Sequence, residues 1–231
     1  MANKNNFLVI SDCHIPYEHH GALKFLKDLQ KEYDIPHENI YSVGDLLDLY
    51  NFSRYPKSPN APDSAVKEIE HARATIKKWA QAFPEMKMCH SNHDQRIWRK
   101  ATESELPSQV IRSIEEIFDF PKSWQLKDMF IVCGTRGEFL IEHGEGFSGI
   151  NGARDAAIAN GIPTIIGHLH ANAGVSFIKT RQQSLWSMNV GCLVDPESFA
   201  FAYGKYSKMK PTLGAGLVLK GGTHPVYVPL T

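Results

Sequence analysis

Five short polar clusters are the features of this sequence best suited to chemistry. They are Asp12-Cys13-His14, Gly44-Asp45-Leu46-Leu47-Asp48, Ser91-Asn92-His93-Asp94, His143-Gly144 and Gly167-His168-Leu169-His170. Nearly every cluster follows a run of apolar residues, so each is expected at the end of a β-strand. Because a fold can bring the ends of successive strands to one edge of a sheet, we expect the clusters to converge there.

The residue types in these clusters are those that bind metal ions. Asp supplies a carboxylate, Asn an amide oxygen and His an imidazole nitrogen, a ligand set that suits Mn, Fe, Zn or Ni. Seven such residues are too many for a single tetrahedral zinc ion. Their number suits two metal ions that share a bridging carboxylate. The clusters therefore predict a site for two metal ions.

In their order along the chain, the clusters resemble the signature blocks of the calcineurin-like metallophosphoesterases. Those blocks read D-x-H, G-D-x-x-D, G-N-H-[DE], H and G-H-x-H, and here they extend from residue 12 to residue 170, about two thirds of the chain. Each block alone is a weak signal, but five in the family order form a strong one. One position departs from the pattern, because Ser91 stands where the family usually has Gly.

The resemblance implies which residues would bind each metal ion. The ligands would be Asp12, His14 and His170 for one ion, and Asn92, His143 and His168 for the other, with Asp45 bridging both. His168 and His170 are two residues apart, so in an extended strand end they share a face and can reach adjacent metals. Of the four candidate metals, manganese is favoured.

The resemblance also implies the catalytic roles. The nucleophile would be a hydroxide bound to the two ions that Asp45 bridges, so that no Ser or Cys nucleophile is needed. His93 is not needed as a ligand, and in the family this residue protonates the leaving oxygen or stabilises the charge on phosphorus. Either Asp48 or Asp94 could orient an imidazole through its second nitrogen.

Three arginines and one asparagine are candidates for substrate binding. Arg96 is the strongest, because it follows His93 by three positions and would face the same side of a helical turn. Arg54 and Arg99 are further candidates, since a guanidinium group matches a phosphate, although an exposed helix face is the alternative for Arg99. Asn172 is expected at the rim of the cleft.

The composition indicates an ordinary globular enzyme. The 231 residues are enough for one substantial core, and we expect a single domain over residues 1–231. Lys and Arg together number 25, as do Asp and Glu, so no overall charge attracts nucleic acid or an anionic membrane. The sequence has no signal-peptide pattern and no apolar run that could span a bilayer. The four cysteines are scattered, which indicates reduced thiols in a cytoplasmic protein.

The remaining sequence predicts the elements that position the clusters. Apolar runs predict strands at residues 7–10, 40–43, 86–89, 130–132, 139–141, 164–166, 175–179, 185–190 and 217–219. Helices are predicted at 22–33, from Asp63 or Ser64 to 82, in two pieces within 95–119 separated near Pro107, and up to Asn160 with Gly161 as its cap. Strand–helix alternation followed by mostly strands predicts a mixed α/β sandwich. With the family resemblance, we expect a four-layer α/β/β/α sandwich of two mixed sheets with flanking helices.

The resemblance implies hydrolysis of a phosphate ester. In the phosphoprotein phosphatases of this superfamily the second block contains an Arg and the third ends in Glu, whereas here the second block continues as Leu49-Tyr50 and the third ends in Asp94. These differences favour a phosphodiesterase or nuclease acting on nucleotide or nucleic-acid phosphodiesters. The alternatives are a phosphomonoesterase, including one of protein-phosphatase type, and a non-catalytic metal-binding module.

The charge distribution narrows the expected substrate. A non-specific nuclease usually neutralises several phosphates with Lys and Arg. Here the cationic residues are dispersed, apart from Arg96, Arg99 and Lys100. We therefore expect a short or single-stranded nucleic acid, or a nucleotide, rather than a long duplex. No membrane partner is expected, and the sequence does not indicate a protein partner.

Overall fold

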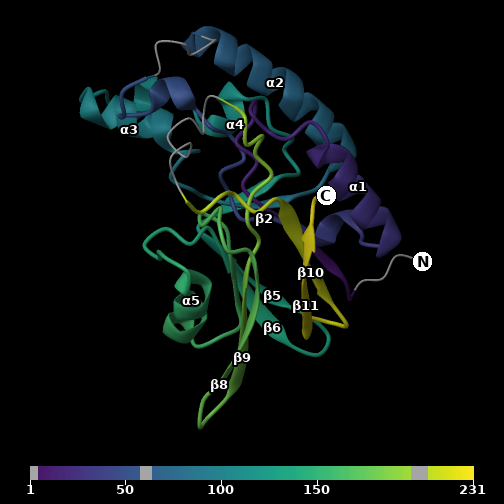
Figure 1. The fold of residues 1–231 in the computed structure, drawn as a ribbon. Coiled ribbons are helices and arrows are strands. Elements are labelled where there is room, and N and C mark those ends of the chain that lie inside the picture. The colour runs from purple at the N-terminus through teal and green to yellow at the C-terminus, as the bar shows by residue number, and fades with distance from the viewer. Residues whose placement is uncertain (1–4, 58–63, 199–207) are drawn as a thin grey trace.

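Two β-sheets form the centre of the molecule (Figure 1). The computed structural model describes residues 5–57, 64–198 and 208–231, and within these the sheets have six and five strands. The first sheet, in the order β11-β10-β1-β2-β3-β4, contains β1 (Phe7–Ile10), β2 (Ile40–Ser42), β3 (Lys87–Cys89), β4 (Gln125–Lys127), β10 (Gly214–Leu219) and β11 (His224–Pro229). The second, in the order β5-β6-β7-β9-β8, contains β5 (Met129–Cys133), β6 (Glu138–Glu142), β7 (Thr164–Ile166), β8 (Gly174–Lys179) and β9 (Ser184–Asn189).

Both sheets are mixed. Strands β1, β2, β3 and β4 are parallel, whereas β10 pairs antiparallel with both β1 and β11. In the second sheet β6, β7 and β9 are parallel, and β5 and β8 pair antiparallel at its two edges. The carboxyl ends of parallel strands lie on the same side of a sheet. The loops after β1, β2 and β3 therefore leave the first sheet together, and those after β6 and β7 leave the second sheet together.

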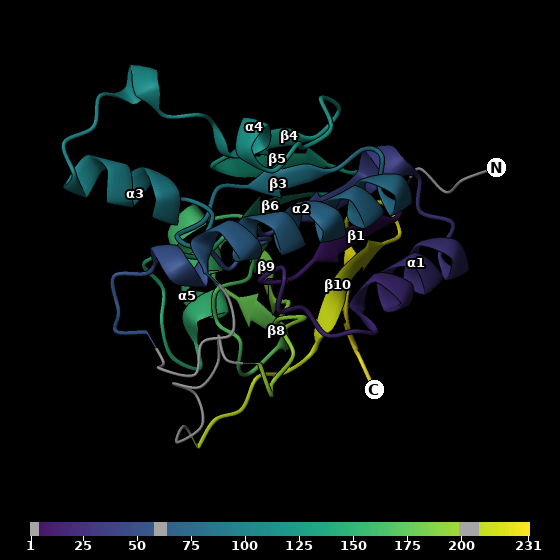
Figure 2. The same cartoon turned by 90° about the horizontal axis from the view of Figure 1, so that it is seen from above.

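Helices cover the outer face of each sheet, as Figures 1 and 2 show. Helix α1 (Ala22–Glu32) packs against β1 and against α2 (Ala65–Ala82), and α5 (Gly152–Asn160) packs against β7 and β9. Two shorter helices, α3 (Arg96–Glu103) and α4 (Ile114–Ile117), come between β3 and β4. The expected four-layer α/β/β/α sandwich is thus confirmed. None of the helices in the described residues is long and apolar enough to cross a membrane.

Strand β1 is buried on both faces and separates the two main parts of the core. Leu8 and Ile10 pack in the apolar layer under α1 and α2. Phe7 and Val9 pack in the layer between the two sheets. Because successive strand residues point to opposite faces, a strand in this position must be apolar at every residue. This explains the uninterrupted apolar run that precedes the first polar cluster.

The expected helix ends agree with the observed caps. The side chain of Ser64 accepts a hydrogen bond from the backbone N–H of Lys67 at the start of α2, whereas Asp63, the other candidate cap, lies outside the described residues. Gly161 ends α5 with φ 68°, a left-handed conformation that glycine adopts at little cost. The helical region 95–119 is divided, as expected, because α3 ends at Glu103 and a 3₁₀ turn follows Pro107.

Two strands, β4 and β11, were not expected from the sequence. Strand β4 is only Gln-Leu-Lys, and it lies at one edge of the first sheet. Strand β11 contains Pro225 and Pro229, which lack a backbone N–H and so argue against a strand. It forms at the other edge of that sheet, where a proline is tolerated because one side of the strand makes no ladder hydrogen bonds.

Candidate metal centre

The five polar clusters meet at the carboxyl ends of five strands. Three of these strands belong to the first sheet and two to the second. The residues are Asp12 and His14 after β1, Asp45 after β2, Asn92 and His93 after β3, His143 after β6, and His168 and His170 after β7. Side chains from the first sheet contact side chains from the second, so the strand ends of both sheets contribute to one site.

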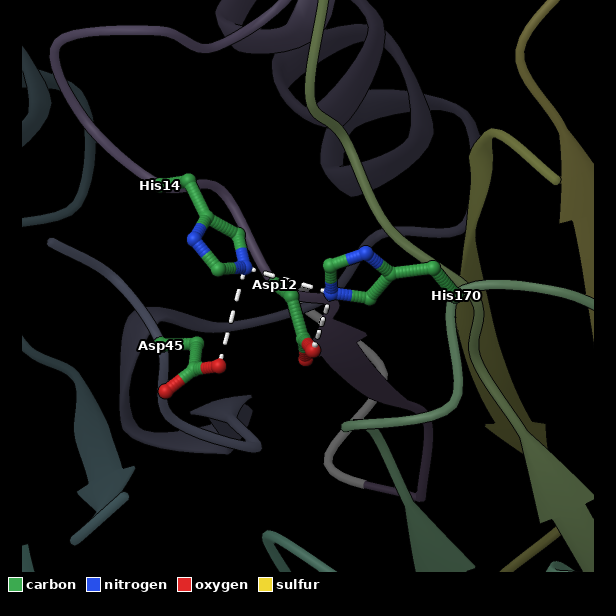
Figure 3. A group of neighbouring side chains, drawn as sticks. All are labelled: Asp12, His14, Asp45 and His170. Atoms are coloured by element: carbon green, nitrogen blue, oxygen red, sulfur yellow. Dashed lines mark hydrogen bonds and ion pairs between the residues drawn. The ribbon is translucent and has the colours of Figure 1, made fainter. Parts of the chain in front are cut away.

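Four of these residues form a first group of potential ligands, Asp12, His14, Asp45 and His170, whose potential ligand atoms all lie within 4.8 Å of one another. Figure 3 shows the four side chains pointing toward one another from three separate loops. Nε2 of His170 is 3.1 Å from Oδ2 of Asp12 and 3.2 Å from Nε2 of His14. Nε2 of His14 is in turn 3.6 Å from Oδ2 of Asp45.

A second group shares Asp45 with the first. It consists of Asp45, His143 and His168, again with ligand atoms within 4.8 Å of one another. Nε2 of His143 lies 3.5 Å from Oδ2 of Asp45 and 3.2 Å from Nδ1 of His168. The amide oxygen of Asn92 is 2.9 Å from the same His143 nitrogen. The structure therefore brings together all seven residues that the family resemblance nominated as ligands, in the two sets that it implied.

These residues fit divalent cations. Oδ1 of Asp12 is buried and has no hydrogen-bond partner in the described part of the chain. A buried carboxylate oxygen in that position is costly unless a cation or another donor satisfies it. The imidazole nitrogens of His14 and His170 face each other, as do those of His143 and His168, so each pair can share at most one hydrogen along the line between them. Carboxylate, imidazole and amide donors together suit first-row divalent metals, and the cluster could hold such ions.

A glycine allows the two sheets to approach at this site. A Cβ atom placed on Gly167 would lie 2.2 Å from Oδ1 of Asp12 and 2.4 Å from Cγ2 of Val43. Any larger residue at position 167 would therefore displace Asp12, a potential ligand, or Val43, which follows β2. The next residue, His168, has φ 62°, and its backbone N–H donates to Oδ2 of Asp12 at 2.8 Å. The Asp12 carboxylate thus fixes the position of the turn at Gly167 and His168 through this hydrogen bond.

Asp48 orients two of the imidazoles. Its Oδ1 accepts a hydrogen bond from Nδ1 of His14 at 2.8 Å. Nδ1 of His93 donates to the backbone carbonyl of Asp48 at 3.0 Å and lies 3.1 Å from the same Oδ1. A hydrogen on Nδ1 leaves Nε2 of each ring as the nitrogen available to a metal ion or a substrate. The sequence left Asp48 and Asp94 as alternatives for this role, and the geometry favours Asp48.

Asp94 and Ser91 instead connect the loops after β2 and β3. The Asp94 carboxylate accepts hydrogen bonds from the backbone N–H of Leu47 at 2.9 Å and from the Ser91 hydroxyl at 2.6 Å. The same hydroxyl accepts a hydrogen bond from the backbone N–H of Asp45 at 2.8 Å. Ser91, the one departure from the family pattern, therefore supports the shared ligand through a contact that its position in the sequence did not reveal.

Burial and neighbouring charges set the protonation of the potential ligands. Burial by itself raises the pKa of Asp45, but the surrounding imidazoles, His93 foremost, lower that pKa well below its usual range. Burial lowers the pKa of His14 and of His168. At neutral pH Asp45 is therefore a carboxylate and these two histidines are neutral, the forms in which they can bind a metal ion.

His93 lies beside the two ligand groups. Its Nε2 is 4.0 Å from Oδ2 of Asp45 and accepts a hydrogen bond from Nη2 of Arg96 at 2.8 Å. Nη1 of Arg96 donates to the backbone carbonyl of Asp48 at 2.8 Å. Arg96 thus faces the same side of its turn as His93, as the three-residue spacing predicted.

A cavity of about 180 Å³ adjoins this side of the site. Its lining residues are Ser53, Arg54, Tyr55, Asn92, Arg96, Arg99, Glu145 and His168. His168 belongs to the second ligand group and the amide oxygen of Asn92 contacts His143 of that group, so the cavity adjoins the candidate metal centre. All three arginines nominated from the sequence line it.

Asn172 lies in another cavity. It has φ 60° and lines a space of about 340 Å³ between the start of α5 and strands β8 and β9, together with Leu169 and Asn189. That space is lined by none of the seven potential ligands. A role for Asn172 in substrate binding stays a prediction.

Known proteins resemble this chain in structure. No protein-family model matches the chain, and no curated protein matches its sequence. Among solved structures, an archaeal phosphodiesterase is 15% identical, with a TM-score of 0.51 over 97% of this chain and 99% of that chain. Vacuolar protein sorting 29 from Cryptosporidium parvum is 11% identical, with a TM-score of 0.52 over 98% of this chain and 92% of that chain.

Both structures have the calcineurin-like metallophosphoesterase fold, and this chain has the same fold, as the sequence resemblance predicted. At such low identities the likeness concerns the fold alone. One of the two proteins is a phosphodiesterase and the other a vacuolar protein sorting protein, so the fold does not select a function. The function must be inferred from the site itself.

Proposed function

We propose that this protein hydrolyses phosphodiesters of nucleotides or short nucleic acids with two divalent metal ions. The observation that supports this most strongly is that two groups of potential ligands share one carboxylate. Oδ2 of Asp45 lies 3.6 Å from Nε2 of His14 in the first group and 3.5 Å from Nε2 of His143 in the second. Pairs of metal ions that share ligands in this way are typical of phosphatases and nucleases.

Each proposed ion has its own ligands beside the shared one. The sets are Asp12, His14 and His170 for the first ion, and Asn92, His143 and His168 for the second. When bound, such a pair supplies Lewis acidity to the phosphoryl oxygens and lowers the pKa of a bound water. Manganese is the first metal to test, followed by iron, zinc and nickel.

His93 is the proposed donor of the proton that the leaving oxygen requires. The backbone carbonyl of Asp48 holds Nδ1 of the ring, so Nε2 is turned toward Arg96, which lines the adjoining cavity. The ring is mostly buried and lies next to Asp45 without belonging to the shared-ligand groups. Nε2 accepts from Arg96 in this structure and so carries no hydrogen there. His93 can donate to a substrate oxygen once Nε2 takes up a proton, which burial opposes but the carboxylates of Asp45 and Asp48 favour, so that the pKa of His93 is raised.

The preference for diesters is tested with two chromogenic substrates. Purified protein supplied with each of the four metals in turn should hydrolyse bis-p-nitrophenyl phosphate faster than p-nitrophenyl phosphate. His224→Ala, which replaces an exposed histidine on β11, is the matched control and should behave as the wild type. A faster reaction with the monoester would indicate a phosphomonoesterase. No turnover of either substrate with any metal would indicate a metal-binding module without catalytic activity.

A further inference from the structure

We infer that the arginine-lined cavity beside the candidate metal centre binds a second phosphate group of the substrate, on the leaving-group side of the bond that is cleaved. This inference rests on the proposed phosphodiesterase function and narrows its substrate class. The preferred substrate would carry at least two phosphates, as in a short strand or a nucleotide diester with a terminal phosphate. A diester with a single phosphate would leave the cavity without an anion.

The position of the cavity supports this assignment. Asn92 and His168 form part of its wall; His168 belongs to the second group of potential ligands, and the amide oxygen of Asn92 contacts His143 of that group. A substrate whose reacting phosphate is held at the metal centre therefore has the cavity directly beside it. An adjacent part of the same substrate can enter it without any rearrangement of the ligand residues.

The charge of the cavity selects an anion. Its wall contains three arginines and one acidic residue, Glu145. A guanidinium group stays charged at any physiological pH and offers paired N–H donors that match two phosphate oxygens. Within the described residues, neither Arg54 nor Arg99 forms an ion pair with an acidic side chain. Their charges are thus not neutralised by the part of the protein that the structure describes.

The three arginines of the cavity differ in the number of hydrogen bonds that hold their side chains. Arg96 is fixed by its bonds to His93 and to the carbonyl of Asp48. Arg99 donates one hydrogen bond from Nη2 to the backbone carbonyl of Asn92, at 3.1 Å. Arg54 comes from a different segment, just after the 3₁₀ turn Tyr50–Phe52, so the three arginines come from two separate parts of the chain. Such a construction can surround a compact anion from more than one direction.

The contact between Arg96 and His93 indicates the side of the substrate that enters. His93 is the proposed proton donor to the leaving oxygen, and Arg96 both contacts its Nε2 and lines the cavity. The group that departs with that oxygen must therefore lie nearest the arginines. A second phosphate on the departing group would meet them, whereas a phosphate on the retained group would not.

Three dinucleotides of thymidine test this inference by activity. They are TpT without a terminal phosphate, pTpT with a 5′-phosphate and TpTp with a 3′-phosphate. One of the two phosphorylated forms should show a kcat/KM about tenfold above that of TpT, mainly through a lower KM, because charge-assisted hydrogen bonds to one further phosphate are gained. In Arg54→Ala and in Arg99→Ala this ratio should fall toward one. Arg181→Ala, which removes an exposed arginine from the turn between β8 and β9, is the matched control and should keep the wild-type ratio.

A binding measurement separates this inference from the proposed function. Calorimetry on the 231-residue protein compares thymidine 3′,5′-bisphosphate with thymidine 5′-monophosphate. The wild type should bind the bisphosphate more tightly, and Arg54→Ala should lose about tenfold of that preference. Equal binding of both probes, or equal hydrolysis of all three dinucleotides, would overturn the second-phosphate site. If no dinucleotide is hydrolysed but the binding preference depends on Arg54, the site stands and the diesterase function fails.

Discussion

The hydroxyl of Ser91 accepts the backbone N–H of Asp45 at 2.8 Å, so a residue outside the ligand set supports the one ligand that both groups share. Asp45 has φ 46°, in the left-handed region that is uncommon for residues other than glycine. A backbone in that conformation persists only where its surroundings hold it. Ser91, 46 residues further along the chain, provides part of that support.

Replacing Ser91 should therefore destabilise the protein. Ser91→Ala leaves the buried N–H of Asp45 without its acceptor and Asp94 without one of its donors. We expect the free energy of unfolding to fall by roughly 1–3 kcal/mol, the usual cost of an unsatisfied buried polar group. Urea denaturation followed by circular dichroism measures this, with the exposed Ser184→Ala as control. An unchanged midpoint would show that the hydroxyl gives no such support.

Asp48→Asn should reduce both metal affinity and activity. The amide can no longer accept a charge-assisted hydrogen bond from His14, and the negative charge 3.1 Å from Nδ1 of His93 is removed, so both rings are held less firmly. Mutations of residues that orient metal ligands typically cost 10–100-fold, and we expect a loss of about that size here. Metal content and the rate of bis-p-nitrophenyl phosphate hydrolysis are measured on the same sample. Wild-type values for both would show that Asp48 is dispensable for the orientation of the rings.

His93→Ala should keep the bound metal ions and lose activity. Its ring is 4.0 Å from the Asp45 carboxylate and is not needed in either ligand set, so elemental analysis should match the wild type. Loss of a general acid costs roughly 10²–10⁴-fold in rate. The loss should be smaller for nitrophenyl esters than for alkyl esters, because a good leaving group needs little protonation. An equal loss on both ester types would argue that His93 acts through charge or structure alone.

Glu18 should make the stability of the protein fall as the pH rises. Burial raises its pKa from the usual 4.5 to about 7, and its Oε2 has no hydrogen-bond partner within the described residues. The folded protein therefore retains this proton at a pH where the unfolded chain has released it. The stabilisation is complete below about pH 4.5 and is lost as the pH rises through about 7.

Glu18→Gln removes this dependence. At pH 8 we expect the variant to be more stable than the wild type by roughly 1–3 kcal/mol, because the cost of burying a charged carboxylate is absent. At pH 4 the two proteins should be similar. Thermal unfolding across this pH range measures the difference, and Glu115→Gln, at an exposed position of α4, is the control. A parallel pH profile in wild type and variant would show that Glu18 titrates normally.

The convergence of the polar clusters could be predicted from local patterns, whereas their division into two ligand groups was implied by the family resemblance. Each potential ligand follows an apolar run or a tight turn, and parallel strands place such residues at one edge of a sheet. The position of Asp12 and His14 could be predicted as soon as β1 was recognised as a buried strand. The sequence could not choose between Asp48 and Asp94, since that choice depends on which side chain faces the imidazoles after the loops pack together.

The residues that support the site could not be predicted from the sequence, because their contacts also depend on how the loops pack together. The bond between Ser91 and Asp45 joins segments far apart in the chain, and no local pattern marks it. Arg54, Arg96 and Arg99 could be nominated by residue type, but only the packing of α3 beside the 3₁₀ turn after β2 brings them to one cavity. Strand β11 was not predicted because its prolines argue against a strand. Its position at the edge of the sheet, which tolerates proline, could not be known from the sequence.

The most direct test is the hydrolysis of bis-p-nitrophenyl phosphate by chelator-treated protein as Mn²⁺ is added back. If two ions share Asp45, we expect no turnover without metal and a rate that rises until about two equivalents of Mn²⁺ are bound per chain. Asp45→Asn should not recover at those concentrations, because the shared carboxylate charge is gone. Turnover that survives chelation, full recovery with a single equivalent, or normal recovery in Asp45→Asn would each rule out the shared two-metal site.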